Sequence, residues 1–272
     1  MNQTKIGIDA GGTLVKVAYR ESSSIVYQTF PSQAIYDAVS WLNDSFLNPI
    51  VCITGGKSQL LAEKLTAPAK TIVEFDATNR GVHFLAGQQR DAIENNFMFV
   101  NIGTGTSIHY AKDMEQQRVG GTGIGGGTLM GLAYLLTGLW DYERIVQLAS
   151  NGDRGNVDLK VKDIFEGALP PISGELTASN FGKKESMMAR NPSESDILAA
   201  IIGMIGEVIV TVSSQMAFQH NVGSIIYFGS SLRSNPLLRD IIKEYTRLAG
   251  KEPVFLKNGE YSGAVGALLS LD

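Results

Sequence analysis

Short apolar runs alternate with longer amphipathic segments along the first third of the chain. Residues 6–9, 14–19 and 24–30 are rich in Ile, Val, Thr and aromatic residues, which predicts three strands. Residues 33–47 carry apolar side chains at spacings of three and four, which predicts a helix with one buried face. The pattern continues with a strand at 50–54, a helix at 58–64, a strand at 71–75 and a helix at about 78–88. Helices that follow strands in this way indicate an α/β fold.

The same pattern restarts near residue 97. Strands are predicted at 97–101 and 106–110, then helices at 130–139, 141–151 and 194–220, and finally strand 224–228, helix 236–249, strand 253–256 and helix 262–269. The segments DAGGT at 9–13 and NIGTGT at 101–106 share a polar residue at a strand end followed by a Gly/Thr turn. This weak internal repeat predicts two related halves. We therefore expect two domains, residues 1–92 and 93–272.

Composition narrows the possible classes of protein. A length of 272 residues fits two domains or one large one, and 44% hydrophobic against 18% charged residues excludes a disordered chain. The net charge of −4, with no long basic run, makes nucleic acid an unexpected partner. No signal-peptide pattern opens the chain, and the apolar stretch 197–206 is far shorter than the roughly 20 residues of a membrane span. We expect a cytoplasmic protein with no membrane partner.

The cysteine and histidines indicate neither a metal cluster nor a catalytic triad. Cys52 lies in an apolar run, where a buried thiol is the expected state. His83, His109 and His220 are far apart and have no Cys, Asp or Glu at metal-ligand spacing, so we expect structural roles for them.

Two glycine turns are candidates for phosphate binding. The segment 9–16 places Asp9 at a strand end beside a turn in which Gly11 and Gly12 let the backbone approach an anion; Lys16 adds a positive charge. Asp9 is suited to hold Mg²⁺ through water. An ordinary hairpin turn with a solvated Asp9 is the alternative. Residues 101–107 form a second loop of the same construction, so two loops could hold a polyphosphate from opposite sides of a cleft. Neither loop has P-loop or Rossmann spacing.

Two further segments resemble parts of a nucleotide site. Residues 118–128 contain six glycines before a helix predicted from about 129, an arrangement suited to anions or to close contact with a base and ribose. Arg118 beside them could pair with a carboxylate or phosphate, or it could be an ordinary surface arginine. Residues 227–240 form a strand that ends in glycine and serines ahead of a helix, and they could close over an adenosine.

One acidic pair is a candidate for proton transfer. Glu74 and Asp76 fall at the end of the predicted strand 71–75, where alternate side chains share a face. Glu74 could accept the proton of an attacking hydroxyl, or the pair could be solvated. For Asp76 we prefer the N-cap of the helix predicted from 78. For Glu74 the residues alone leave the choice even.

In the order of its motifs, the chain resembles the type II pantothenate kinases of the acetate and sugar kinase, Hsp70 and actin superfamily. The resemblance covers nearly the whole length. It rests on IGIDAGGTLVK (6–16), VEFDA (73–77), NIGTGTS (101–107), RVGGTGIGGG (118–127), GDRGNVDLKVKDIF (152–165), LTASNFG (176–182), YFGSSLRSNPLLR (227–239) and GEYSGAVGALL (259–269).

The resemblance implies two ribonuclease H-like, actin-like ATPase domains that face an ATP cleft, and transfer of the γ-phosphoryl of ATP with Mg²⁺ to pantothenate. The product is 4′-phosphopantothenate, the first intermediate of coenzyme A biosynthesis. Glu74 matches the catalytic base and Arg118 the pantothenate-binding residue; Thr177, Ala178 and Tyr245 fall where substrate-side contacts are expected. The positions that match ATP-contacting residues are Asp9, Ala10, Gly11, Gly12, Thr13, Leu14, Val15, Lys16, Thr104, Gly126, Gly127, Thr128, Leu129, Met130, Tyr142 and Ser230.

The family forms homodimers, and we expect the interface along the predicted helix 194–220. Two other functions stay open. One is a kinase for another small metabolite, such as an amino sugar. The other is an ATP-binding regulator or filament-forming actin relative without kinase turnover.

Overall fold

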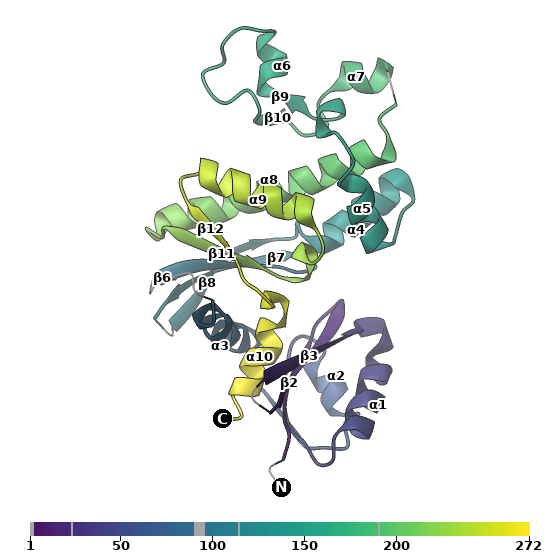
Figure 1. The fold of residues 1–272 in the computed structure, drawn as a ribbon, viewed down its shortest axis with the longest axis vertical. Helices are drawn as coiled ribbons and strands as arrows, with labels where there is room; N and C mark the ends of the chain where they lie inside the picture. Colours follow the sequence, from purple (N-terminus) through teal and green to yellow (C-terminus); the bar gives the residue numbers. More distant parts are fainter. Residues whose placement is uncertain (1–2, 23, 90–95, 114, 190) are drawn as a thin grey trace.

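Two five-stranded mixed sheets, one above the other, form the body of the protein (Figure 1). The computed structural model describes residues 3–22, 24–89, 96–113, 115–189 and 191–272. The N-terminal sheet has the order β3-β2-β1-β4-β5, and the C-terminal sheet has the order β12-β11-β6-β7-β8. In each sheet three antiparallel strands that are consecutive in the chain are followed by two parallel ones. This shared topology confirms the predicted relation between the two halves.

The N-terminal sheet is built as its apolar runs predict. Its strands are β1 (Lys5–Ala10), β2 (Leu14–Glu21), β3 (Ser24–Pro31), β4 (Ile50–Thr54) and β5 (Ala69–Thr71). Helices α1 (Ile35–Ser45) and α2 (Ser58–Ala62) follow β3 and β4. The apolar face of α1 packs on the sheet through Ile35, Ala38 and Leu42. Cys52 is buried in β4, as expected.

The C-terminal sheet carries the larger core. Its strands are β6 (Asn96–Ile102), β7 (Thr106–Lys112), β8 (Glu115–Thr122), β11 (Ser224–Phe228) and β12 (Glu252–Phe255); its helices are α4 (Gly126–Thr137), α5 (Tyr142–Ala149), α8 (Glu194–Gln219) and α9 (Pro236–Leu248). By length and composition α8 could cross a membrane, but 72% of its most apolar window is buried inside the protein. Its apolar residues therefore fill the core of this domain.

An arm extends from the C-terminal domain at the end farthest from the N-terminal sheet (Figure 1). It comprises a 3₁₀ turn (Arg154–Asn156), β9 (Leu159–Lys160), α6 (Val161–Phe165), β10 (Thr177–Ser179) and α7 (Lys184–Ala189). Arg154 ties the arm to α8 through an ion pair with Glu207 at 2.6 Å, and a second ion pair with Asp158, at 2.7 Å, lies within the arm. The sequence pattern predicted none of these elements.

Helices α3 (Glu74–Gly87) and α10 (Ser262–Leu269) lie between the two sheets (Figure 1). The two helices cross with their backbones in contact at Gly81 and Gly266. A methyl group at Gly266 would overlap the carbonyl oxygen of Ala77, and one at Gly81 would overlap that of Ser262. Although α10 ends the chain, it packs on β1 and β2 of the N-terminal sheet. The predicted domain boundary at 92 falls within 90–95, outside the described residues.

Three sequence predictions are wrong. Residues 71–75 do not form one strand: β5 ends at Thr71 and α3 begins at Glu74. Asp76 consequently lies inside the first turn of α3, and the N-cap is Val73, with no capping side chain. The glycine-rich segment from Arg118 is also no free loop, because β8 runs through it to Thr122.

Candidate active site

A buried carboxylate at the end of β1 is the centre of the candidate site. Asp9 Oδ2 lies 3.5 Å from the ammonium of Lys16 across the β1–β2 hairpin, and both side chains are 15% exposed. Burial raises the pKa of Asp9, and the charge of Lys16 opposes that shift. The pair meets because Asp9 and Lys16 are directly opposed in the antiparallel register.

Two glycines from distant segments enclose the Asp9 carboxylate. A methyl group at Gly55, which follows β4, would lie 2.8 Å from Oδ1, and one at Gly263, in the first turn of α10, would lie 3.0 Å from Oδ2. Gly55 also has a φ of +93°, a conformation that favours glycine. The backbone of these two segments thus restricts the orientation of this carboxylate.

Glu74 belongs to the same electrostatic cluster. It is the first residue of α3, not a strand residue, so Glu74 and Asp76 share a helix turn and not a sheet face. Partial burial raises the pKa of Glu74, the negative charge of Asp9 raises it further, and Lys16 lowers it. The structure therefore brings Asp9, Lys16 and Glu74 together from β1, β2 and α3.

The two predicted phosphate loops, one from each half of the chain, are in contact. The hydroxyl oxygens of Thr13 and Thr104 lie 2.9 Å apart. In the first loop the amide of Gly11 donates to Leu14, whereas the amides of Gly12 and Thr13 donate to none of the described residues. These two amides are available to an anion held beside Lys16.

The N-terminus of α4 supports the second loop from behind. The amides of Gly126 and Gly127 donate to the carbonyls of Gly103 and Thr104, at 2.8 Å each. They are therefore not the free donors of an anion-binding helix end. Thr128, Leu129 and Met130 continue the same helix.

The 227–240 segment lies beside this helix. Ser231 donates from its hydroxyl to the Gly103 carbonyl at 2.9 Å, and Tyr142 donates to the Ser231 carbonyl at 2.8 Å. Ser230 begins the 3₁₀ turn Ser230–Leu232, which also contains Ser231. A pocket of about 270 Å³ opens along the same segment, lined by Gly229 and Arg233 among others. The predicted ATP-contacting residues of α4, α5 and this turn are therefore neighbours.

Arg118 lies on β8 next to a β-bulge. The β7–β8 register shifts between Ile108 and His109, so that Val119 has no partner and Arg118 pairs with His109. The Arg118 guanidinium lies over Gly121, where a methyl group would approach it to 2.5 Å. Bulges of this kind redirect side chains next to active sites.

Thr177, Ala178 and Tyr245 are not brought together with Glu74 within one chain. Thr177 and Ala178 are in β10 of the arm, and the C-terminal sheet with its helices α8 and α9 lies between the arm and α3 (Figure 1). The hydroxyls of Thr177 and Tyr245 both bond to Glu207 Oε1, at 2.8 and 2.9 Å. In this chain they belong to the polar cluster that secures the arm.

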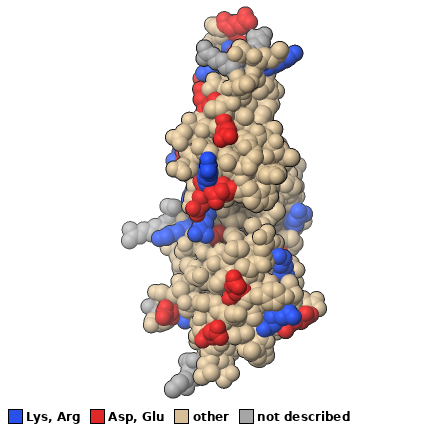
Figure 2. Space-filling model, turned by 90° about the vertical axis from the view of Figure 1, so that its right-hand side faces the viewer, with Lys and Arg blue, Asp and Glu red and all other residues tan. Residues whose placement is uncertain are grey.

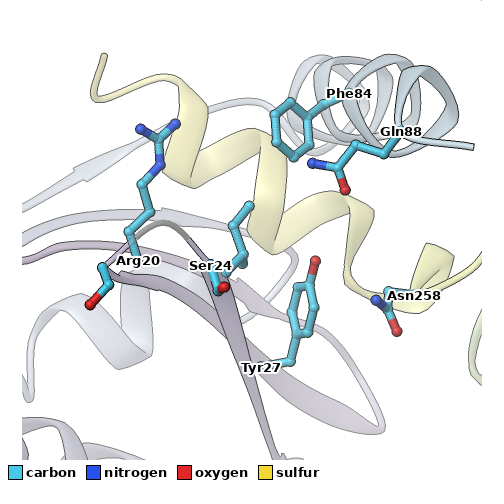
Figure 3. Close-up of a pocket in the computed structure, with 8 residues that line it drawn as sticks. Arg20, Ser24, Tyr27, Phe84, Gln88 and Asn258 are labelled. Carbon is cyan, nitrogen blue, oxygen red and sulfur yellow. The ribbon is translucent and has the colours of Figure 1, made fainter.

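A second concave region lies away from these residues. Figure 3 shows a pocket of about 400 Å³ between the β2–β3 hairpin, the last turns of α3 and Asn258. None of the site residues predicted from the sequence lines it. On the face shown in Figure 2, acidic and basic side chains are interspersed in small groups.

The donor set at the cleft fits a magnesium ion shared with phosphate. Among the described residues, no three His, Cys, Asp or Glu side chains gather into a metal-binding group. Mg²⁺ with a nucleotide needs only one or two carboxylates, because phosphate oxygens and waters complete its shell. Asp9 supplies an oxygen ligand of that kind.

Sequence reasoning missed several residues of the site. Gly55 and Gly263 are noticed only once the fold brings them to Asp9. Lys57 lies two residues after Gly55, and its amide donates to the Ala10 carbonyl at 2.9 Å, so the turn after β4 supports the first predicted phosphate loop. The two glycines and the lysine of this turn are visible in the sequence and could have indicated that it belongs to the candidate site.

Comparisons with known proteins give a consistent result. A family model described as Fumble matches residues 22–270. The type II pantothenate kinase of Staphylococcus saprophyticus is 42% identical over 264 residues, covering 97% of this chain and 99% of that protein. That of Staphylococcus haemolyticus is 43% identical, covering 97% and 98%.

Solved structures show the same fold at low identity. An activator of the 2-hydroxyisocaproyl-CoA dehydratase from Clostridium difficile, with bound ADPNP, gives a TM-score of 0.63 at 16% identity, covering 98% of this chain and 94% of that one. A ROK family glucokinase from Streptomyces griseus, in complex with glucose and AMPPNP, gives 0.58 at 13% identity, covering 98% of each chain. The predicted fold class, α/β with two related actin-like halves, is confirmed.

Proposed function

This chain belongs to the Fumble family of type II pantothenate kinases, and on that premise we propose that it transfers the γ-phosphoryl of ATP to pantothenate with Glu74 as the catalytic base. The product is 4′-phosphopantothenate, in the first step of coenzyme A biosynthesis. The observation that carries the assignment of the base is the cluster of Asp9, Lys16 and Glu74 at the mouth of two facing phosphate loops.

In the proposed mechanism the protein positions the reactants and neutralises charge. Lys16 and the free amides of Gly12 and Thr13 hold the phosphate chain from the N-terminal side, and the Thr104 loop holds it from the other. Glu74 accepts the proton of the primary hydroxyl of pantothenate as that oxygen attacks phosphorus. The pKa of Glu74 is raised toward the neutral pH at which the enzyme works, and a general base is more effective when its pKa is closer to that pH.

Asp9 is proposed to hold Mg²⁺ through water. When bound, the ion would neutralise charge on the phosphate oxygens. Asp9 suits this role because Gly55 and Gly263 fix its orientation and Lys16 satisfies only one of its oxygens.

Arg118 is proposed to bind the pantothenate carboxylate. Thr177, Ala178 and Tyr245 remain proposed substrate-side residues, but in one chain they are remote from Glu74. They could contact pantothenate beside Arg118 if the arm of another protomer closes over it, which links their role to the proposed homodimer. Light scattering after gel filtration tests the dimer: we expect twice the chain mass of 29.3 kDa. Because α8 is mostly buried in the core, we do not assign it to a membrane, and we propose the cytoplasm as the location of the protein.

ADP release from purified protein with Mg-ATP, measured with and without pantothenate, tests the function. We expect release that depends on pantothenate and that falls roughly 100-fold or more in Glu74→Gln, the size of a general-base contribution. Asp76→Asn, in the same helix turn, is the matched control and should retain activity. N-acetylglucosamine replaces pantothenate in a parallel reaction. Release with the amino sugar alone would identify a sugar kinase, and release with neither substrate would favour a non-catalytic nucleotide-binding protein.

A further inference from the structure

The residue after the proposed base makes a contact that the proposed mechanism does not use. The ring of Phe75, in the first turn of α3, packs on the imidazole of His109 in β7, with centroids 4.9 Å apart and planes inclined by 57°. His109 also stacks on Phe99 of β6 at 4.7 Å, with the planes 2° apart. Contacts among three rings therefore join the start of α3 to the C-terminal sheet.

His109 is a rigid partner for Phe75. It is 1% exposed, and its Nδ1 lies 2.8 Å from Oε1 of Gln116 on β8. Burial lowers the pKa of His109, the Gln116 hydrogen bond opposes this, and the charge of Arg118 lowers the pKa further. A neutral ring held on two sides cannot readily change its orientation.

The stack also leads to Arg118. Phe99 pairs with His109, and His109 pairs with Arg118, on the adjacent strands β6, β7 and β8. Residues directly opposed on neighbouring strands project from the same face of a sheet. Phe75, the residue after Glu74, contacts the middle member of this row, His109, and Arg118 is one end of the row.

Core packing alone does not explain Phe75. Its side chain remains 37% exposed although it touches a buried ring. The start of α3 also has no capping side chain at Val73, so this turn lacks the usual local anchor. Contact with His109 supplies an anchor from the other domain.

We propose that Phe75 and His109 position Glu74: the ring contact holds the first turn of α3 against the C-terminal sheet and so fixes the Glu74 carboxylate relative to Arg118. Phe75 is a positioning residue, because it acts through Glu74. The inference rests on the proposed function for its effect on the reaction, but the anchoring of the helix turn is independent of it.

Phe75→Ala tests the proposal. We expect kcat to fall at least about tenfold, since small misplacements of a catalytic group are costly, while KM for ATP stays within twofold. Phe75→Tyr, which keeps the ring, should restore kcat to within about threefold. Phe84→Ala is the matched control: it removes the same side chain from a later turn of α3, in the pocket of Figure 3, and should leave kcat unchanged.

A double variant separates positioning from general destabilisation. In Glu74→Gln, adding Phe75→Ala should lower kcat no further, because the group being positioned is already lost. An undiminished kcat in Phe75→Ala, the same loss in Phe84→Ala, or an additive loss in the double variant would each overturn the proposal.

Amide exchange measures the anchor without the reaction. In Phe75→Ala, the amides at 77–80, the first that the helix hydrogen bonds protect, should exchange at least about tenfold faster than in the wild type, while those at 82–86 are unchanged. Unchanged exchange at 77–80 overturns the anchor. If the wild type releases no ADP with pantothenate, it is the proposed function that fails, and this exchange measurement alone decides the anchoring.

Discussion

The orientation of the Asp9 carboxylate depends on the glycines around it, which leave it room because they have no side chain. Adding a methyl group at Gly263 would bring carbon to 3.0 Å from Oδ2, so Asp9 must shift or rotate. We predict that Gly263→Ala raises KM for Mg-ATP at least fivefold. Alanine is favoured over glycine in a helix by up to about 1 kcal/mol, so the loss should occur without a lower melting temperature.

Steady-state kinetics over a range of Mg-ATP concentrations, with thermal unfolding in parallel, checks this. Gly87→Ala is the matched control, since a methyl group there meets nothing within 4 Å at the end of α3. An unchanged KM in Gly263→Ala would mean that Asp9 does not need this orientation.

Arg118 offers a second test at the scale of one residue. A guanidinium can hold a carboxylate through two parallel hydrogen bonds, whereas an ammonium is a point charge. Arg118→Lys should therefore raise KM for pantothenate about tenfold or more and leave KM for ATP within twofold. Equal changes in both constants would show that Arg118 acts on the cleft as a whole. The two constants are measured in separate titrations of the ADP-release assay.

At the scale of elements, one buried carboxylate secures the arm. Glu207 of α8 accepts hydrogen bonds from Arg154, Thr177, Asn180 and Tyr245. Burial alone would raise the pKa of Glu207, but Arg154 and these bonds outweigh it and hold the pKa below its ordinary value. This is a concentrated, partly buried contact between the arm and the domain.

We predict that Glu207→Gln lowers the free energy of unfolding by about 2–3 kcal/mol at pH 7, because it leaves the Arg154 charge poorly compensated. A carboxyl with a lowered folded-state pKa stabilises the fold above its unfolded pKa, here near 4.5, and loses that effect as the pH falls below it. The difference in unfolding free energy between wild type and variant should therefore shrink from pH 7 to pH 3.5. Denaturant unfolding at both pH values measures it, and a constant difference would contradict the ion-pair explanation.

Local sequence signals predicted most elements but few contacts between them. Strand 50–54, strand 224–228 and helix 262–269 agree with β4, β11 and α10 at both ends, because each has a strong pattern and clear boundaries. The start of α3 was missed because VEFD has strand-like side chains, while its helical state depends on packing against the other domain. Strand β8 was not predicted, because glycines are unusual in strands. In the structure the sheet accommodates them next to a bulge.

The same holds for the candidate site. Both glycine turns could be identified from local spacing, and the structure brings Thr13 and Thr104 into contact; that these turns bind phosphate stays a prediction. Gly263 and His109 could not be identified, because the features that matter are a distance to Asp9 and a ring stacked on Phe75. Such contacts join residues far apart in sequence, and one sequence alone contains no signal for them.

At the scale of the whole molecule, the C-terminal helix α10 packs on the N-terminal sheet and covers one of its faces. Helix α10 lies against β1 and α3, and its buried Ala264, Val265 and Leu268 belong to the core that joins the two sheets. The N-terminal sheet cannot cover this face with its own helices, since α1 packs through the separate core of that half. Stability of the N-terminal half therefore depends on the last eleven residues.

Deletion of residues 262–272 should abolish folding of the N-terminal half, because burial of Val265 and Leu268 alone contributes about 1.5–3 kcal/mol each and β1 would be exposed. Deletion of residues 270–272 is the control: it removes the Asp272 ion pairs with Lys5 and Arg20, which are partly exposed and contribute little. We expect the longer deletion to give insoluble protein, or soluble protein with fast amide exchange throughout β1, β2 and β4, while the shorter one melts within a few degrees of wild type. Native-like exchange in β1 after the longer deletion would show that the two halves fold independently and that α10 only docks afterwards.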